Sequence, residues 1–159
     1  ASGGTIGQLE ASARQMTRWA KARLDIQNSL FIDHSGLGAA SRVTPNEMVG
    51  ALQKALLIRP EFPQLMKKIK PRDARGNLDR KSAALILAKT GTLHYVSALA
   101  GYVTEGVARP YAFAIFCQDL EQRQKLLASA RETSSNARYW NRRAKQVQQN
   151  VLRKWSQKL

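Results

Sequence analysis

Three adjacent residues in the middle of the chain, Lys89, Thr90 and Gly91, combine side-chain types that can bind and orient a ligand. They stand in the segment "AKTGTLHYVSALAGYV", residues 88–103, whose small and apolar residues are in strand-like order. An ammonium group buried without a partner costs on the order of several kcal/mol, so a buried strand would normally exclude a charge at Lys89. A glycine has no Cβ, so Gly91 lets another backbone approach the strand closely.

The composition is that of a globular chain with a strong positive charge. The 159 residues are 43% hydrophobic and 23% charged, and 26 Lys and Arg against 11 Asp and Glu give a formal net charge of +15. Such a charge suits any anionic partner, including nucleic acid, membrane surfaces and acidic cell-wall polymers. Cys117 is the only cysteine, so no intrachain disulfide can form. A single cysteine does not indicate whether the protein works in an oxidising or a reducing compartment.

Several kinds of segment and site are not expected. The chain has no apolar run long enough to span a membrane. Its first residues lack the basic region and apolar core of an intact secretion signal. Only His34 and His94 could offer imidazole ligands, and there are no clustered cysteines. We therefore expect no metal and no cofactor.

Hydrophobic periodicity predicts helices and one short strand in the first part of the chain. A helix is expected over residues 6–24. Its inner face would carry Leu9, Ala13, Met16 and Ala20. A short strand is expected over residues 30–32, followed by a loop rich in Gly and Ser. Thr44 and Pro45, with Glu47 three residues after Thr44, predict the capped start of a second helix.

The second part of the chain predicts three consecutive strands followed by helices. Strands are expected over 83–93, 97–104 and 111–117, the second of them central in the sheet because both of its faces are apolar. Helices are expected over 120–133 and 137–159, the latter with an inner stripe of Trp140, Ala144, Val147, Val151 and Trp155. Consecutive strands joined by short turns are antiparallel, so the fold class is α+β.

The segments "AKTGTL" and "VSALAGYV", with "SGLGAASRVTP" upstream, resemble the C-terminal part of the penicillin-binding D-alanyl-D-alanine carboxypeptidases of peptidase family S13. Lys-Thr-Gly alone is a weak signal, but the flanking matches and their order make the resemblance specific. It spans nearly the whole chain. It implies part of the serine β-lactamase and penicillin-binding fold, an antiparallel sheet flanked by helices. Residues 1–133 would then be the C-terminal part of the peptidase domain, and 134–159 a basic amphipathic helix packed on it or extending it.

The resemblance also implies roles for five residues. Lys89 would attract the terminal carboxylate of the substrate and stabilise negative charge near the nucleophile. The backbone N–H of Thr92 would complete an oxyanion hole. Thr90 would offer its hydroxyl to the same carboxylate, Gly91 would admit the substrate backbone, and Leu93 would line the side of the pocket. The substrates would be peptidoglycan stem peptides, and β-lactams would act as inhibitors.

Two elements that such enzymes need are absent from the sequence. No lysine in the chain has a serine three positions before it, so there is no Ser-x-x-Lys pair to supply an activated nucleophile. The Ser-x-Asn pattern occurs only at residues 134–136, after the Lys-Thr-Gly instead of before it, and is better explained as a helix junction. We therefore expect a C-terminal portion that is inactive alone and needs the N-terminal portion of the same enzyme.

The upstream segment "DHSGLGAASRVTP" departs from the usual family form, Asp-Gly-Ser-Gly-Leu-Ser-Arg. His34 stands in place of a glycine, and Gly38 and Ala39 stand in place of Ser-Arg. A substrate contact through that arginine is therefore in doubt, and Arg42 is offset from its position. Asp33 and Ser35 are expected to brace the loop, and His34 to be a solvated loop residue.

The C-terminal segment is strongly basic. Residues 121–159 hold ten Lys or Arg and two Glu, a net charge of +8. A solvated helix face is the first interpretation, and peripheral contact with an anionic cell-envelope surface is the second. Nucleic-acid binding is not expected, because no helix-turn-helix, zinc site or aromatic-basic motif accompanies the charge. The family resemblance implies a periplasmic or cell-envelope location. The rival hypothesis is a non-catalytic basic module that binds an anionic polymer.

Overall fold

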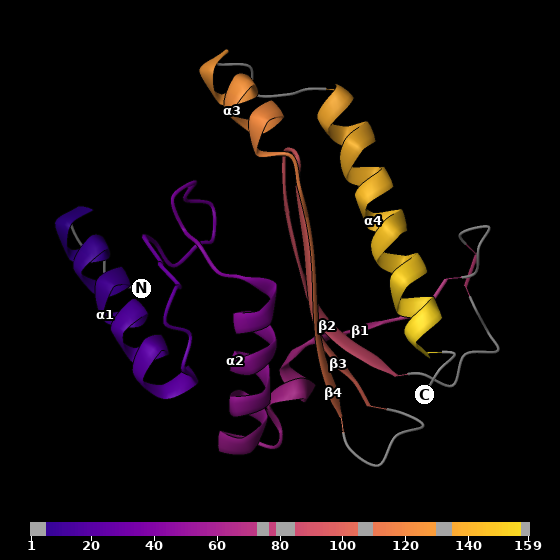
Figure 1. Cartoon of the computed structure of the whole chain (residues 1–159), viewed down its shortest axis with the longest axis horizontal. Helices are drawn as coiled ribbons and strands as arrows, with labels where there is room; N and C mark the ends of the chain where they lie inside the picture. The colour runs from indigo at the N-terminus through magenta and orange to yellow at the C-terminus, as the bar shows by residue number, and fades with distance from the viewer. Residues whose placement is uncertain (1–5, 73–76, 79–84, 105–109, 130–134, 157–159) are drawn as a thin grey trace. The chain divides into compact units, whose positions relative to one another are not determined.

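The computed structural model describes residues 6–72, 77–78, 85–104, 110–129 and 135–156. The chain forms two compact units, Ala1–Pro60 and Glu61–Leu159, and each is described by itself (Figure 1). The division expected from the sequence, 1–133 and 134–159, stays a prediction. Among the described helices, none has both the length and the apolar character needed to cross a membrane.

The described residues of the first unit form the helices α1 (Ile6–Leu24) and α2 (Pro45–Ile58), as predicted. Their contact is built around a small apolar cluster of Ala20, Ile26 and Ala51, with Leu24 and Phe31 packed against it. The buried hydroxyl of Thr17 in α1 accepts a hydrogen bond from Phe31 N–H at 3.0 Å. That bond ties the segment after α1 back to the helix.

The predicted capping box of α2 is confirmed. Glu47 N–H donates to Thr44 Oγ1 at 3.1 Å, and Thr44 N–H donates back to Glu47 Oε2 at 3.2 Å. Glu47 Oε1 also accepts from Asn28 N–H at 2.6 Å. A single carboxylate therefore satisfies the start of α2 and holds the preceding loop.

Two expectations for this unit are wrong. Leu9 is 53% exposed, because the buried side of α1 runs instead over Ala13, Thr17 and Ala20. Residues 30–32 form no strand. Only an isolated antiparallel bridge joins Leu30 to Arg42, through two backbone hydrogen bonds of 2.9 and 2.7 Å.

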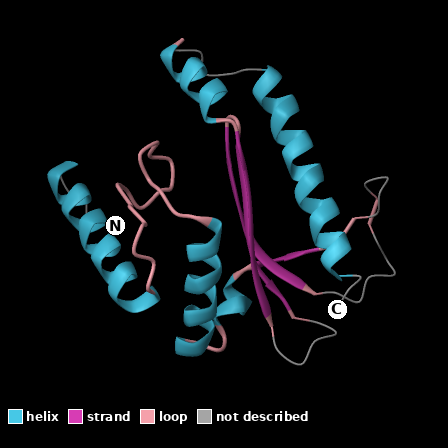
Figure 2. Ribbon diagram, viewed as in Figure 1, coloured by secondary structure: helices cyan, strands magenta, loops and turns pink. Residues whose placement is uncertain are grey.

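The described residues of the second unit contain a four-stranded antiparallel sheet in the order β1-β2-β3-β4. Its elements are the 3-10 helix η1 (Phe62–Leu65), β1 (Lys67–Ile69), β2 (Ile86–Leu93), β3 (Val96–Val103), β4 (Tyr111–Gln118), α3 (Leu120–Ala128) and α4 (Ser135–Ser156). Figure 2 shows these strands as one sheet. The predicted α+β class, the antiparallel sheet and the inner position of β3 are confirmed.

Some boundaries differ from the predicted ones. The short strand β1 was not predicted, because Lys67–Ile69 is only three residues long and has two exposed lysines. Helix α4 begins at Ser135, two residues before the predicted start at 137. The expected start of β2 at 83–84, the end of the 120–133 helix at 130–133 and the end of the last helix at 157–159 lie outside the described residues.

The register of the sheet divides its side chains between two faces. Residues that pair directly lie on the same face of an antiparallel sheet. One face carries Ile86 and Ala88 of β2, Leu99 and Val103 of β3 and Phe113 of β4, and α4 adds Leu152 to form the largest apolar cluster. The opposite face carries Leu87, Lys89, Gly91 and Leu93 of β2 with the buried Tyr102 of β3.

Helix α4 packs on the face that contains Phe113, alongside the sheet (Figure 1). The predicted inner stripe is correct for Ala144 but wrong for Val147, which is 52% exposed, and for Trp155, which is 42% exposed although its ring contacts Phe113. The buried residues of α4 are Ala137, Asn141, Ala144, Gln148 and Leu152. Two of these are polar amides, and they are buried because they hydrogen-bond to the sheet.

Candidate functional site

Strand β2 changes character at the Lys-Thr-Gly segment. Its first residues, Ile86–Ala88, include two of the most buried side chains of the sheet and pair with β1. From Lys89 to Thr92 every residue is exposed. In the part of the chain that the structure describes, no strand pairs with β2 on the β1 side from Lys89 to Leu93. The segment therefore presents an open strand edge.

The hydrogen-bond pattern identifies the backbone groups at this open edge. Thr104 N–H donates to Leu85 O at 2.8 Å, so residues 85 and 104 form a hydrogen-bonded pair. Antiparallel pairs alternate between hydrogen-bonded and non-hydrogen-bonded, and the register of β2 and β3 continues without a bulge. Thr90 and Thr92 are consequently in non-hydrogen-bonded pairs, with Leu99 and Ser97 of β3. Their N–H and C=O groups point away from β3, toward the open edge.

The side chains of the segment lie on both faces of the sheet. Lys89, Gly91 and Leu93 share one face, and Thr90 and Thr92 share the face on which α4 packs. The Lys89 ammonium is exposed and donates to Thr90 O at 3.3 Å. It therefore reaches round the strand to the open edge, and it is not buried in the sheet.

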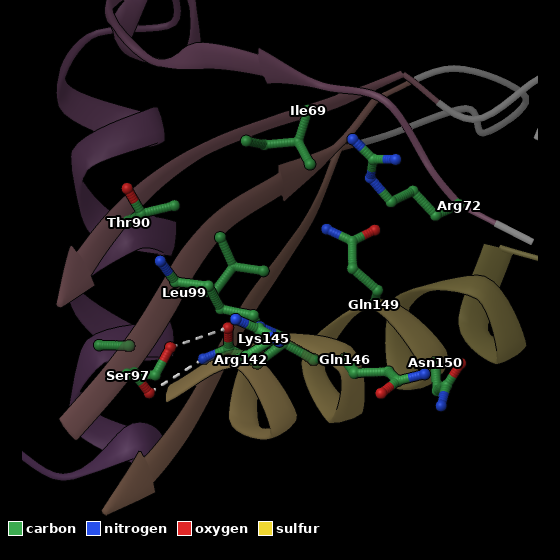
Figure 3. Close-up of a pocket in the computed structure, with 12 residues that line it drawn as sticks. Ile69, Arg72, Thr90, Ser97, Leu99, Arg142, Lys145, Gln146, Gln149 and Asn150 are labelled. Carbon is green, nitrogen blue, oxygen red and sulfur yellow. Dashed lines mark hydrogen bonds between the residues drawn. The ribbon is translucent and has the colours of Figure 1, made fainter. Parts of the chain in front are cut away.

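A pocket of about 380 Å³ lies beside Thr90 on the α4 face. Figure 3 shows Thr90 and Leu99 on neighbouring strands and Gln149 extending from α4 toward Arg72. Arg142 and Lys145 of α4 also line it, and none of the described lining residues is acidic. Its charge therefore favours an anionic group. The oxygen Oε1 of Gln149 is buried and has no hydrogen-bond partner among the described residues.

Gln148 lines this pocket and is held by hydrogen bonds to the sheet. Its Nε2 donates to Ser97 O at 2.9 Å and to Ile115 O at 3.3 Å, while Ser97 Oγ donates to Gln148 Oε1 at 3.2 Å. Figure 3 draws the bonds to Ser97 as dashed lines. Because Ser97 pairs with Thr92, these bonds attach α4 directly behind the exposed end of β2.

The loop after α1, in the first unit, is held by its own side chains. Asp33 Oδ1 accepts from Gly36 N–H at 2.8 Å, from Ser35 N–H at 2.9 Å and from Ser35 Oγ at 3.1 Å. Led by the bond from Gly36, these interactions lower the pKa of the Asp33 carboxyl. The predicted bracing role of Asp33 and Ser35 is confirmed. Arg42 Nη1 donates to two carbonyls of the same loop, those of Ala39 and Ser41.

His34 is exposed, and its Nε2 lies 3.1 Å from Ser12 Oγ. Within the residues that the structure describes, no group of three or more His, Cys, Asp or Glu side chains could hold a metal ion. The Cys117 thiol lies 3.9 Å from Ala144 O, and burial raises its pKa. The Lys-Thr-Gly segment therefore stands as the candidate site.

The structure brings together all five residues singled out in the sequence, since Lys89, Thr90, Gly91, Thr92 and Leu93 are consecutive on β2. Their roles stay predictions. Sequence reasoning missed that Arg142 and Lys145 line the same pocket as Thr90, because it assigned the basic residues of this helix to a solvated face. The alternation of polar amides with alanines along α4 was the available signal for its buried side.

Comparison with known proteins supports the pattern found in the sequence. A family model described as the D-Ala-D-Ala carboxypeptidase 3 (S13) family matches residues 6–136. A search of curated proteins found no match. The matched range includes all four strands of the described part of the chain and the open edge of β2, and it ends just after the start of α4.

Proposed function

Because the chain belongs to the D-Ala-D-Ala carboxypeptidase 3 (S13) family, we propose that it supplies the Lys-Thr-Gly wall of a serine-type D-Ala-D-Ala carboxypeptidase or endopeptidase. The observation that carries this proposal is the open edge of β2 from Lys89 to Leu93. An extended peptide can add to such an edge as a further strand. The substrate would be a peptidoglycan stem peptide, and the enzyme would work in the cell envelope.

The backbone of β2 suits this mode of binding. Thr90 and Thr92 present N–H and C=O groups to the open edge, which is the alternation that an added strand requires. Between them, Gly91 has free space, since a Cβ built there would meet only Ala98 Cβ, at 3.6 Å. The absence of a side chain leaves room for the substrate backbone beside the strand.

Each residue then has a distinct task. The Lys89 ammonium, already at the edge through its bond to Thr90 O, binds the terminal carboxylate of the peptide and stabilises negative charge. The Thr90 hydroxyl binds the same carboxylate, and Leu93 lines the side of the site. The Thr92 N–H is one donor of the oxyanion hole, and such a donor contributes about 3 kcal/mol to lowering the barrier.

The nucleophile comes from outside these 159 residues, which contain no Ser-x-x-Lys. In the complete site the serine Oγ attacks the carbonyl carbon of the penultimate D-Ala, and the neighbouring lysine takes its proton. The C–N bond then breaks, and the terminal D-Ala leaves as its amine takes up a proton. Water hydrolyses the resulting ester. A β-lactam acylates the same serine.

Fluorescent penicillin tests this proposal directly. The 159 residues alone should form no covalent adduct, because they have no activated serine. Addition of a segment that carries the family's Ser-x-x-Lys and Ser-x-Asn motifs, as one chain or as a complementing fragment, should restore labelling. Peptide mass mapping should then locate the label on a serine outside residues 1–159. A label on Ser35, or on any other serine of this sequence, would contradict the proposal.

The composition of helix α4 supports a second candidate function, which is the binding of an anionic polymer such as a cell-wall glycan. Its 22 residues include six Lys or Arg and no Asp or Glu. The Arg143 guanidinium lies 5.9 Å from the centre of the exposed Tyr139 ring, an arrangement that adds an aromatic surface to the charge. Retention on heparin that falls steeply between low and moderate salt would favour this candidate. Weak retention at low salt would remove it.

A further inference from the structure

The turn that ends the Lys-Thr-Gly strand is held by later parts of the chain. His94 and Tyr95 connect β2 to β3. Arg123 Nη1, in α3, donates to His94 O at 3.1 Å, and Asn141 Nδ2, in α4, donates to Leu93 O at 2.8 Å. Asp119 N–H donates to Tyr95 O at 2.9 Å. The carbonyls of Leu93, His94 and Tyr95 therefore each accept a hydrogen bond from a later part of the chain.

Tyr95 adds a strained backbone and a ring contact to this turn. Its φ is 58°, in the left-handed region that a tyrosine rarely adopts. Its side chain is buried and packs edge-on against Trp140 of α4, with ring centres 6.0 Å apart. A strained residue persists only where its surroundings hold it, and such residues cluster at functional sites.

The strand before the turn has little other support. From Lys89 to Thr92 it is exposed and pairs on one side only, with β3. Thr92 is two residues from His94, so the position of its N–H depends on the turn. Burial of the Asn141 side chain costs free energy, because its Oδ1 is buried and has no hydrogen-bond partner among the described residues. An unsatisfied buried group of this kind calls for an explanation.

We propose that Arg123 and Asn141 are positioning residues that hold the Thr92 N–H in place for the oxyanion hole. This inference rests on the function proposed above. Neither side chain reaches the open edge; each acts through a carbonyl of the turn. Asn141 lies beyond residue 136, where the family match ends.

Two substitutions test the inference, each with a matched control. Asn141→Asp replaces the donor with a carboxylate facing Leu93 O, and Asn136→Asp makes the same change at an exposed position of α4. Arg123→Gln removes the bond to His94 O, and Arg18→Gln makes the same change at an exposed position of α1. Arg123→Lys keeps a cationic donor for His94 O, so this variant should behave much more like the unmodified chain than Arg123→Gln does.

The first measurement is amide hydrogen exchange in the 159-residue chain, which requires no nucleophile. Asn141→Asp and Arg123→Gln should each speed exchange about tenfold at the amides of Gly91, Leu93 and Val96, which belong to hydrogen-bonded pairs of β2 and β3. Exchange at residues 99–102 of β3 should stay unchanged. The two controls should match the unmodified chain. If Asn141→Asp unfolds the protein, Arg123→Gln still decides the question, because it removes one bond at a half-buried side chain.

The second measurement is the rate of acylation by penicillin in the enzyme completed with the Ser-x-x-Lys segment. The two variants should slow acylation about tenfold or more at saturating penicillin, with little change in half-saturation. The positioning role is overturned if the variants change neither acylation nor exchange. It is also overturned if exchange becomes faster while acylation stays normal. In both cases the proposed function still stands. If the unmodified completed enzyme is not acylated at all, the proposed function itself fails.

Discussion

Gly101 lies directly opposite Ala88 in the sheet, and the two strands approach so closely there that no side chain fits at Gly101. A Cβ built on Gly101 would lie 2.6 Å from Ala88 Cα. Gly91 differs, although it stands only three residues after Ala88, since its added Cβ would make an ordinary contact at 3.6 Å. One glycine is required by the packing of the sheet, and the other leaves space beside the candidate site.

Alanine substitutions should therefore affect the two glycines differently. Gly101→Ala should force β2 and β3 apart and lower the free energy of unfolding by about 1–3 kcal/mol. Gly91→Ala should leave the free energy of unfolding unchanged or raise it slightly, because alanine reduces the conformational entropy of the unfolded chain. Urea unfolding followed by circular dichroism measures both. Equal losses in the two variants would contradict the distinction.

Gly91→Val should block acylation of the completed enzyme without unfolding it. The added methyl groups would occupy the space beside the strand in which the ligand backbone is proposed to lie. Penicillin labelling and thermal unfolding should be measured on the same preparation. Labelling that survives the substitution would show that the ligand does not bind beside Gly91.

Lys89→Ala should slow acylation far more than it affects folding. The Lys89 side chain is exposed, and a hydrogen bond from a charged donor contributes about 1.5–3 kcal/mol, which is about tenfold to a hundredfold in rate. Lys68→Ala is the matched control, since Lys68 is also exposed and lies on the same face of the sheet. If the two variants are acylated equally fast, Lys89 has no role in the site.

Tyr102 should ionise at a higher pH than an ordinary tyrosine. Its side chain is fully buried in β3, and burial raises its pKa from 10 to about 12 because the phenolate would lose its hydration. The unfolded chain ionises first, so the stability that the neutral phenol contributes is complete below pH 10. It should be lost as the pH rises toward 12. Ultraviolet titration at 295 nm should show a late phase that Tyr102→Phe removes.

Local sequence patterns predicted most of the elements of the fold. The capped start of α2 depends on residues within four positions of one another, so Thr44, Pro45 and Glu47 sufficed to predict it. The three long strands were found because their side chains alternate or are apolar throughout. The strand β1 was missed because Lys67–Ile69 forms only through pairing with distant residues 86–88.

The buried face of α4 shows why periodicity alone was insufficient. Val147 was expected inside and is exposed, while Gln148 is buried. A hydropathy pattern counts an amide as polar, but Gln148 has its hydrogen bonds satisfied by Ser97 and Ile115. Those partners lie more than thirty residues away, so only the folded chain shows that burying this side chain is favourable.

The sequence by itself determined the family, the position of Lys89, Thr90 and Gly91 on a strand, and the lack of a Ser-x-x-Lys nucleophile in these residues. Each of these depends on residue types at short, fixed spacing. The tertiary structure alone decided that β2 is open on one side from Lys89 to Leu93, which backbone groups face that edge, and which distant residues hold its turn. Strand pairing and burial join residues far apart in the chain, and no local pattern encodes them.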